Sequence, residues 1–256
     1  MDDMEISARF LAAQAIARES GRLALSYFRN LDTLTVETKG VQNITSEADL
    51  EVEALIRGRL EALYPDDGFL GEESGAKERR GDASGIWVVD PIDGTACFVN
   101  GIPVWCVSIA YLLGNEIEIG VIFDPNADEL FATRHGHGAS LNGAPMRVSG
   151  AQSVEDGTVG IGYSTRTSPQ PVVTAIDRLL SAGGMYQSNG SGALMLAYVA
   201  AGRLIGYYEA HINAWDCLAG IALVREAGGW TNDFLAGDGL KRGNVIVVAA
   251  PGVAAA

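Results

Sequence analysis

The sequence has few basic residues. Its 256 residues include 18 lysines and arginines against 32 aspartates and glutamates, which gives a formal net charge of −14 at pH 7. Nonspecific binding to nucleic acid depends on lysine and arginine that neutralise phosphates, and an acidic surface repels such a polyanion. We therefore predict that nucleic acid is not a partner of this protein.

Cysteine is also scarce, and long apolar runs are absent. The three cysteines, Cys97, Cys106 and Cys217, cannot all pair and show no C-x-x-C spacing, so the sequence indicates neither a disulfide framework nor a zinc ribbon. No stretch approaches the roughly 20 apolar residues that a membrane-spanning helix needs. The first residues are acidic where a signal peptide would be basic. We expect a cytoplasmic protein that does not bind a membrane.

The N-terminal part has helical periodicity. Apolar or small residues from Ile6 to Phe28 follow steps of three and four, which predicts an amphipathic helix over 5–29. Ser46 followed three residues later by Asp49 is typical of a capping box, and it predicts the start of a second helix.

The remaining chain has strand patterns first and alternating patterns later. Short β-branched and aromatic runs between Gly, Asn and Asp residues predict strands at 68–71, 86–90, 104–113, 117–123, 129–133 and 145–148. Beyond residue 150 we predict strands at 157–162, 203–208 and 244–249, which alternate with helices at 169–182, 191–201 and 215–227. Such alternation favours an α/β layer. We predict an α+β half over 1–150 and an α/β half over 151–256.

Two carboxylates follow the predicted strand at 86–90. The segment reads Asp90-Pro91-Ile92-Asp93-Gly94-Thr95. Proline fixes one backbone angle, and glycine lets a ligand approach the backbone closely. Mg²⁺ prefers oxygen ligands on a rigid frame, and the Ile92 carbonyl could add a third. An ordinary turn explains these residues about as well, because Asp and Gly are the commonest turn formers.

The spacing excludes two better-known aspartate motifs. An EF-hand loop that began at Asp90 would need glutamate at its twelfth position, which is Gly101 here. A nucleophilic aspartate would precede Asp-Gly-Thr by one residue, whereas two residues separate Asp90 from Asp93. The pattern therefore favours metal ligation over a phosphoaspartate.

Further acidic residues stand far apart in the sequence. Glu72 and Glu73 end a short apolar strand, where adjacent like charges are costly unless a cation is bound. A solvated acidic loop is the alternative. Asp216 opens a predicted helix, a position that the helix dipole favours for an acid with or without a metal.

Taken together, several segments resemble the inositol monophosphatase family, in the family's order and over nearly the whole chain. They are Gly71-Glu72-Glu73-Ser74, Trp87 to Thr95, Gly190-Ser191-Gly192-Ala193, Tyr208-Glu209, Trp215-Asp216 and Glu226-Ala227-Gly228-Gly229. The resemblance implies a layered αβαβα sandwich and Mg²⁺-dependent hydrolysis of a small phosphate monoester by a metal-activated water. It also implies inhibition by lithium and a homodimer.

The resemblance also assigns roles to single residues. It implies one Mg²⁺ on Glu72, Asp90 and the Ile92 carbonyl, and a second on Asp90, Asp93 and Asp216. Thr95 and Glu72 would orient the attacking water, and Asp49 would partner Thr95. Asp93 and the backbone of Gly94 and Thr95 would contact the phosphate group, and the alcohol part would meet Gly190, Ser191, Gly192 and Glu209.

The substrate implied is myo-inositol monophosphate or a similar polyol or sugar phosphate. Histidinol phosphate, fructose 1,6-bisphosphate and 3′-phosphoadenosine 5′-phosphate remain alternatives, and so does a protein of this fold that acts by binding a macromolecule. Three departures from the family bear on this choice: Asn43 in Asn43-Ile44-Thr45-Ser46, Cys97 after the Asp-Gly-Thr segment, and Gln187 where arginine is common. Glutamine cannot offer a charged fork to an anion. We expect Gln187, Gly192 and Glu209 to set specificity.

Overall fold

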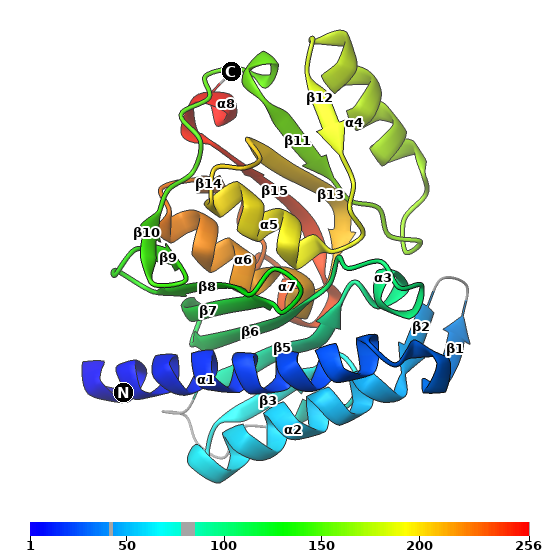
Figure 1. The fold of residues 1–256 in the computed structure, drawn as a ribbon. Coiled ribbons are helices and arrows are strands. Elements are labelled where there is room, and N and C mark those ends of the chain that lie inside the picture. Colours follow the sequence, from blue (N-terminus) through cyan, green and yellow to red (C-terminus); the bar gives the residue numbers. More distant parts are fainter. Residues whose placement is uncertain (41–42, 78–84, 256) are drawn as a thin grey trace.

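Layers of helices and sheets alternate through the molecule in the order helix, sheet, helix, sheet, helix (Figure 1). The computed structural model describes residues 1–40, 43–77 and 85–255, without the side chains of 38–40, 43, 76 and 77. The helices that form the layers are α1 (Asp3–Phe28) and α2 (Glu47–Leu63) on one outside, α5 (Gly192–Ala200) and α6 (Ala214–Glu226) in the middle, and α4 (Gln170–Ser181) on the other outside. The predicted αβαβα fold class is confirmed.

The larger sheet lies between α1 and α2 on one side and α5 and α6 on the other. Its strand order is β10-β9-β8-β7-β6-β5-β3-β4. The strands are β3 (Gly68–Gly71), β4 (Gly75–Lys77), β5 (Ile86–Asp93), β6 (Cys106–Leu113), β7 (Glu116–Asp124), β8 (Glu129–Arg134), β9 (Ala139–Leu141) and β10 (Ala144–Met146). Strands β3 and β5 run parallel, with Gly71 opposite Val89. Their carboxyl ends therefore lie side by side.

The smaller sheet has the strand order β12-β11-β13-β15-β14. Its strands are β11 (Thr158–Ile161), β12 (Met185–Gln187), β13 (Gly206–Ile212), β14 (Trp230–Thr231) and β15 (Asn244–Ala249). Shorter elements are β1 (Val36–Gly40), β2 (Asn43–Ser46), α3 (Thr95–Val99), α7 (Gly239–Arg242), α8 (Pro251–Ala254) and two 3₁₀ turns at Leu31–Thr33 and Val154–Asp156. Strand β13 leads directly into α6, which carries an expected site residue to the edge of this sheet.

The long elements agree with the sequence-based expectations, and the differences lie at short strands. The β1–β2 hairpin, β4, β9, β12 and β14 were not expected, because strands of so few residues show no clear alternation. The strand expected over 203–208 runs instead from Gly206 to Ile212. Residues before it form a turn in which the backbone N–H groups of Arg203 and Leu204 donate to the Tyr198 carbonyl.

The most consequential difference is at the end of β5. The strand was expected to stop at Asp90, but it continues to Asp93 through a bulge opposite β6. Asp90 pairs with Ser108 and Asp93 with Cys106, so β5 uses three steps where β6 uses two. On a regular strand, the side chains of two residues three positions apart point to opposite faces of the sheet. One extra residue in a bulge brings two such side chains to the same face. The bulge therefore turns both aspartates to the same side of the sheet.

The interior between the sheets is filled by apolar residues of α5 and α6, both large and small. A Cβ on Gly220 would lie 2.4 Å from the Cβ of Leu196, so glycine allows these two helices to touch. One apolar cluster fills this space with side chains from both sheets, and a second lies under α1 and α2. The division at residue 150 stays a prediction, because the two halves share the first cluster. Within the described ranges, no helix is long and apolar enough to cross a membrane.

A buried ion pair joins α1 to the start of β3. The Asp67 carboxylate accepts hydrogen bonds from Arg9 Nε at 2.9 Å, from Trp87 Nε1 at 3.1 Å and from the Tyr111 hydroxyl at 3.2 Å. The Arg9 guanidinium also lies 4.3 Å above the ring of Tyr64. This network ties the outer helix to the sheet at the end opposite the expected site.

We predict that Asp67→Ala lowers the free energy of unfolding by about 3 kcal/mol or more, because it leaves the mostly buried Arg9 without its counter-ion. The side chains of Arg9 and Asp67 are 12% and 1% exposed. Denaturant unfolding followed by circular dichroism measures the loss. Glu19→Ala, which removes an exposed partner of Arg59, is the control and should change stability far less. Equal effects of the two substitutions would refute the prediction.

Candidate active site

A cavity of about 780 Å³ opens where the carboxyl ends of β3 and β5 meet the beginnings of α3, α5 and α6. Its walls come from both halves of the chain. The residues to which the family resemblance assigned roles line this cavity, with one exception: Asp49 lies behind Thr95. The lining residues are Glu72, Asp90, Ile92, Asp93, Gly94, Thr95, Gly190, Ser191, Gly192, Glu209 and Asp216.

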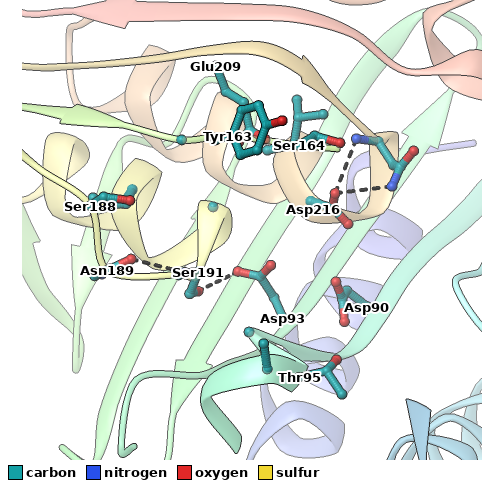
Figure 2. Close-up of a pocket in the computed structure, with 18 of the residues that line it drawn as sticks. Asp90, Asp93, Thr95, Tyr163, Ser164, Ser188, Asn189, Ser191, Glu209 and Asp216 are labelled. Atoms are coloured by element: carbon teal, nitrogen blue, oxygen red, sulfur yellow. Dashed lines mark hydrogen bonds between the residues drawn. The ribbon is translucent and has the colours of Figure 1, made fainter. Parts of the chain in front are cut away.

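Three aspartates form the acidic centre of the cavity. Figure 2 shows Asp90 and Asp93 from the end of β5 facing Asp216 from the first turn of α6. Each offers a carboxylate oxygen, and these atoms all lie within 4.8 Å of one another. The donor set is oxygen only, which is the set that Mg²⁺ prefers. The three residues thus fit a divalent cation.

One oxygen of each aspartate is held by a nearby donor. Oδ1 of Asp90 accepts the backbone N–H of Ile92 at 3.0 Å, and Oδ2 of Asp216 accepts the backbone N–H of Asn213 at 3.1 Å. Oδ2 of Asp93 accepts the backbone N–H of Ala193 at 2.8 Å and also the Ser191 hydroxyl. These bonds fix the carboxylates while they leave the other oxygens free to face the cluster.

The acidic residues of the cavity have raised pKa values. Burial is the main cause: it raises the pKa of Asp93 to about 7 and that of Asp216 to about 6, and the neighbouring negative charges add to the shift for Asp93. Burial and then the charge of Glu72 raise the pKa of Asp90 well above its usual value. Such crowding of like charges is relieved when a cation binds among them.

Glu72 reaches the cavity from the turn that follows β3. Its backbone N–H donates to the Val89 carbonyl at 3.2 Å, which continues the parallel pairing of β3 with β5. Its own pKa is raised well above the usual value by burial and next by the charge of Asp216. Glu72 therefore belongs to the same electrostatic cluster as the three aspartates.

Thr95 and Asp49 form a polar pair beside the cluster. The Thr95 hydroxyl lies 3.2 Å from Oδ1 of Asp49 and 3.0 Å from the Ile92 carbonyl oxygen. Oδ2 of Asp49 accepts the backbone N–H of Ser46 at 2.7 Å and the Ser46 hydroxyl at 2.6 Å, so the expected capping box is confirmed. Burial raises the pKa of Asp49 to about 6.

Glu209 stands on the opposite wall, near Tyr163 and Ser164 (Figure 2). The Tyr207 hydroxyl donates to its Oε2 at 2.5 Å, and burial raises its pKa to about 7. A Cβ on Gly162 would lie 2.3 Å from this Oε2, so only glycine leaves room for the carboxylate. The pair is therefore packed into a fixed position.

The segment before α5 lines the cavity in a way that the sequence did not reveal. The Ser191 side chain turns to Asp93 and also accepts the backbone N–H of Leu194 at 3.2 Å, so it supports an aspartate and caps the helix. Gly190 has φ +92 and packs against Cys97, whose thiol donates to the Asn189 carbonyl at 3.4 Å. The Cys97 departure thus bears on the position of this segment.

Gln187 and Asn43 are the other two departures from the family sequence. Gln187 lies on the exposed edge strand β12 and is not among the residues that line the cavity, so the expectation that it sets specificity is wrong as far as contact with a ligand is concerned. The neighbouring Ser188 and Asn189 line the cavity instead. The side chain of Asn43 lies outside the described part of the chain.

The sequence reasoning missed the loop Tyr163-Ser164-Thr165-Arg166, which follows β11 and lines the cavity. Within the described lining, Arg166 is the single cationic residue. Its charge lowers the pKa of both Glu209 and Asp216 against the larger effect of burial. The position of this loop after a predicted strand could have indicated it, because loops after the carboxyl ends of parallel strands commonly line a ligand crevice.

The fold and the cavity together define a layered α/β protein with an all-oxygen site for metal ions. A model of the inositol monophosphatase family matches residues 7–256, and the chain belongs to this family. Membership supports metal-dependent phosphatase activity.

Relatives with known sequences carry two different names. The chain is 39% identical over 233 residues to the inositol-1-monophosphatase of Mesorhizobium japonicum, a match that covers 90% of this chain and 87% of that protein. It is 40% identical over 224 residues to the Nus factor SuhB of Xylella fastidiosa, covering 87% and 80%.

Solved structures agree with the fold. The extragenic suppressor protein suhB from Bartonella henselae superposes with a TM-score of 0.89 at 34% identity, covering 96% of this chain and 95% of that one. The inositol monophosphatase from Anabaena superposes with a TM-score of 0.83 at 29% identity, covering 96% and 92%.

The raised pKa values predict how stability depends on pH. The folded protein holds protons on Asp93 and Asp216 up to about pH 7 and about pH 6, whereas the unfolded chain releases them near pH 4. Stability from these groups is therefore present at low pH and is lost as the pH rises through the folded pKa values. In EDTA, the thermal midpoint should fall between about pH 4 and pH 7, and excess Mg²⁺ should remove most of the fall.

Differential scanning fluorimetry across this pH range, in EDTA and in Mg²⁺, tests the prediction. Asp93→Asn is the matched control, because it removes one buried titrating group and should flatten the curve in EDTA. A midpoint that rises with pH in EDTA would contradict the assignment of these groups as crowded, buried acids.

Proposed function

We propose that the protein hydrolyses a small phosphate monoester, with myo-inositol monophosphate or a similar polyol or sugar phosphate as its substrate. The observation that carries the proposal is the cluster of Asp90, Asp93 and Asp216, whose oxygens lie within 4.8 Å of one another in a cavity that also holds Glu72 and Thr95. Histidinol phosphate, fructose 1,6-bisphosphate and 3′-phosphoadenosine 5′-phosphate are the alternative substrates.

The metal in this proposal is Mg²⁺. One ion would be held by Glu72, Asp90 and the Ile92 carbonyl, and a second by Asp90, Asp93 and Asp216. When bound, two such ions would neutralise charge on the phosphoryl group and lower the pKa of a water molecule, so that hydroxide becomes available as the nucleophile. The raised pKa values of all four acids support this assignment, since they mark a site that favours a cation.

The protein's own residues position the reactants. The Thr95 hydroxyl, which lies 3.2 Å from Asp49 Oδ1, would donate a hydrogen bond to Asp49 and accept a hydrogen bond from the attacking water, and Glu72 would accept the second hydrogen bond of that water. The backbone N–H groups of Gly94 and Thr95 would bind phosphoryl oxygens beside Asp93. Phosphoryl transfer requires mainly positioning and charge neutralisation, so no protein nucleophile is needed.

The alcohol part of the substrate would be recognised on the opposite wall. Metals and backbone amides recognise the phosphoryl group that all candidate substrates share, so discrimination depends on groups that face the alcohol. Glu209 can accept hydrogen bonds from hydroxyl groups, and Gly190, Ser191 and Gly192 line the same cavity. We therefore propose that residues 1–150 mainly bind the metal and that residues 151–256 set specificity.

The rival function is binding to a macromolecular partner, in keeping with the relatives named Nus factor SuhB. A chain that acted only by binding would not need its metal ligands, and the whole proposed set is present. We infer that neither nucleic acid nor a membrane is a partner, because the net charge is −14. A cytoplasmic location is supported by the three cysteines, all of them free.

We predict that activity on a panel of polyol, sugar, amino-alcohol and nucleotide monophosphates requires Mg²⁺. Asp93→Asn and Asp216→Asn should each lower kcat by more than about a hundredfold, because even loss of a hydrogen-bond partner of a metal ligand typically costs ten- to a hundredfold. Circular dichroism controls for folding. If either variant is folded and keeps its activity, the assignment of a second metal ion is wrong.

Lithium sensitivity belongs to the same proposal. Li⁺ at low millimolar concentration should inhibit the wild-type enzyme, because it would occupy the position of the second Mg²⁺. The assay is run at saturating substrate and limiting Mg²⁺, and an unchanged rate there counts against lithium binding at this position.

A further prediction distinguishes the metal-binding wall of the cavity from the wall that carries Glu209. Glu209→Ala leaves substrate hydroxyls unpaired, which typically costs about 1–3 kcal/mol for the substrates that use them, so it should change the ranking of substrates on the panel. Glu72→Gln should lower the activity on every substrate of the panel by a similar factor. If Glu209→Ala lowers the activity on every substrate by one common factor, Glu209 does not face the alcohol part of the substrate.

We also propose a homodimer, with apolar strands and the segment around 157–187 as the main contributors to its interface. This segment carries exposed apolar side chains on α4 and β12, among them Val173, Leu180 and Met185 at 54%, 47% and 63% exposure. Light scattering at micromolar concentration should give twice the mass of the chain. Met185→Glu should weaken the dimer, and a monomer mass for the wild type would refute it.

A further inference from the structure

Glu53 is a buried acid on α2 that none of the roles above uses. It is 3% exposed and lies four residues after Asp49, so the two carboxylates are neighbours on one face of the helix. Its Oε2 accepts the backbone N–H of Glu73 and its Oε1 accepts that of Ser74, both at 2.8 Å. Each oxygen of the carboxylate therefore holds one amide.

These two amides belong to the turn that immediately follows Glu72. On its other side, the Glu72 backbone N–H is bonded to the Val89 carbonyl of β5. Glu72 is thus fixed from β5 before it and from α2 after it. Bonds from backbone N–H groups to a carboxylate are stronger than neutral ones, so Glu53 restrains the turn firmly.

Gly71 is what lets Glu53 come so close. A Cβ at this position would lie 2.3 Å from Glu53 Oε2 and 2.6 Å from its Cδ. Any side chain at 71 would displace the carboxylate and with it the two amides. The Gly-Glu-Glu-Ser segment therefore combines a residue that points into the cavity with the backbone that α2 holds from behind.

We propose that Glu53 is the positioning residue for Glu72. It acts from the same face of α2 from which Asp49 contacts Thr95, so one helix sets the position of two groups at the cavity. The proposal rests on the proposed function, in which Glu72 binds Mg²⁺. Loss of Glu53 frees the turn, and Glu72 then binds the ion less tightly although its own side chain is unchanged.

The test compares Mg²⁺ binding in four variants by isothermal titration calorimetry and by the Mg²⁺-induced rise of the thermal midpoint. Glu53→Ala should weaken Mg²⁺ binding by about ten- to a hundredfold, the usual effect of losing a hydrogen-bond partner that orients a metal ligand. Glu53→Gln should lose less, because its carbonyl oxygen still accepts one amide. Glu72→Gln is the reference for loss of the ligand itself.

Asp67→Ala is the matched control. Asp67 is also a buried acid with several hydrogen bonds, but it lies at the opposite end of β3 from Glu72. It should lower stability and leave Mg²⁺ affinity unchanged. If Glu53→Ala and Asp67→Ala weaken Mg²⁺ binding equally, Glu53 acts only through stability and the proposal is wrong.

The remaining outcomes separate this inference from the proposed function. If Glu72→Gln weakens Mg²⁺ binding and Glu53→Ala does not, the positioning role alone is refuted. If Glu72→Gln binds Mg²⁺ as the wild type does, the metal assignment fails and the inference fails with it. If Glu53→Ala does not fold, the Mg²⁺ affinity of Glu53→Gln tests the proposal instead. A wild-type Mg²⁺ affinity in that variant overturns the proposal.

Discussion

The mutual repulsion of buried carboxylates at the end of β5 is the constraint on which the rest of this structure depends. Asp90, Asp93, Asp216 and Glu72 line one cavity, where burial, with neighbouring negative charge added to it, raises their pKa values. The fold must hold these groups close without letting them turn away from one another. It does so with fixed donors and with helix starts.

Two of these donors lie at the start of a helix. Asp93 accepts an amide from the first turn of α5, and Asp216 lies in the first turn of α6, where Asn213 holds one of its oxygens. Both helices belong to the layer between the sheets, and their beginnings point to the carboxyl end of β5. Negative charge is favoured at the beginning of a helix, so the middle layer offsets part of the repulsion.

The outer helix α2 adds a second kind of support. Asp49 and Glu53 reach the cavity from behind, one through Thr95 and the other through the turn after Glu72. The opposite wall is less acidic and more varied, with Glu209 held by Tyr207 and with Arg166 on the loop after β11. An acidic wall that faces a wall of mixed composition suits an enzyme that binds the phosphoryl group of every substrate alike and discriminates by the rest of the substrate.

Much of this protein follows from local sequence. The periodicity from Ile6 to Phe28 fixed the first helix within two residues at its start and one at its end, and the spacing of Ser46 and Asp49 predicted a capping box that the structure contains. Joined motifs far apart in the chain predicted the family and the residues that line the cavity. These inferences succeeded because helix periodicity, caps and ligand-bearing turns are set by residues a few positions apart.

The tertiary structure decided what depends on distant pairing. The bulge that turns Asp90 and Asp93 to one side exists only in the register between β5 and β6, and no spacing within β5 reveals it. The same holds for Gln187, which a three-residue edge strand carries away from the cavity, and for Glu53, whose partners are 20 and 21 residues away. Sequence alone determined which chemical groups the protein has and which short segments carry them. Only the packing of sheets and helices decided which of those groups meet, because side-chain direction and register are fixed by contacts between segments that are remote in the chain.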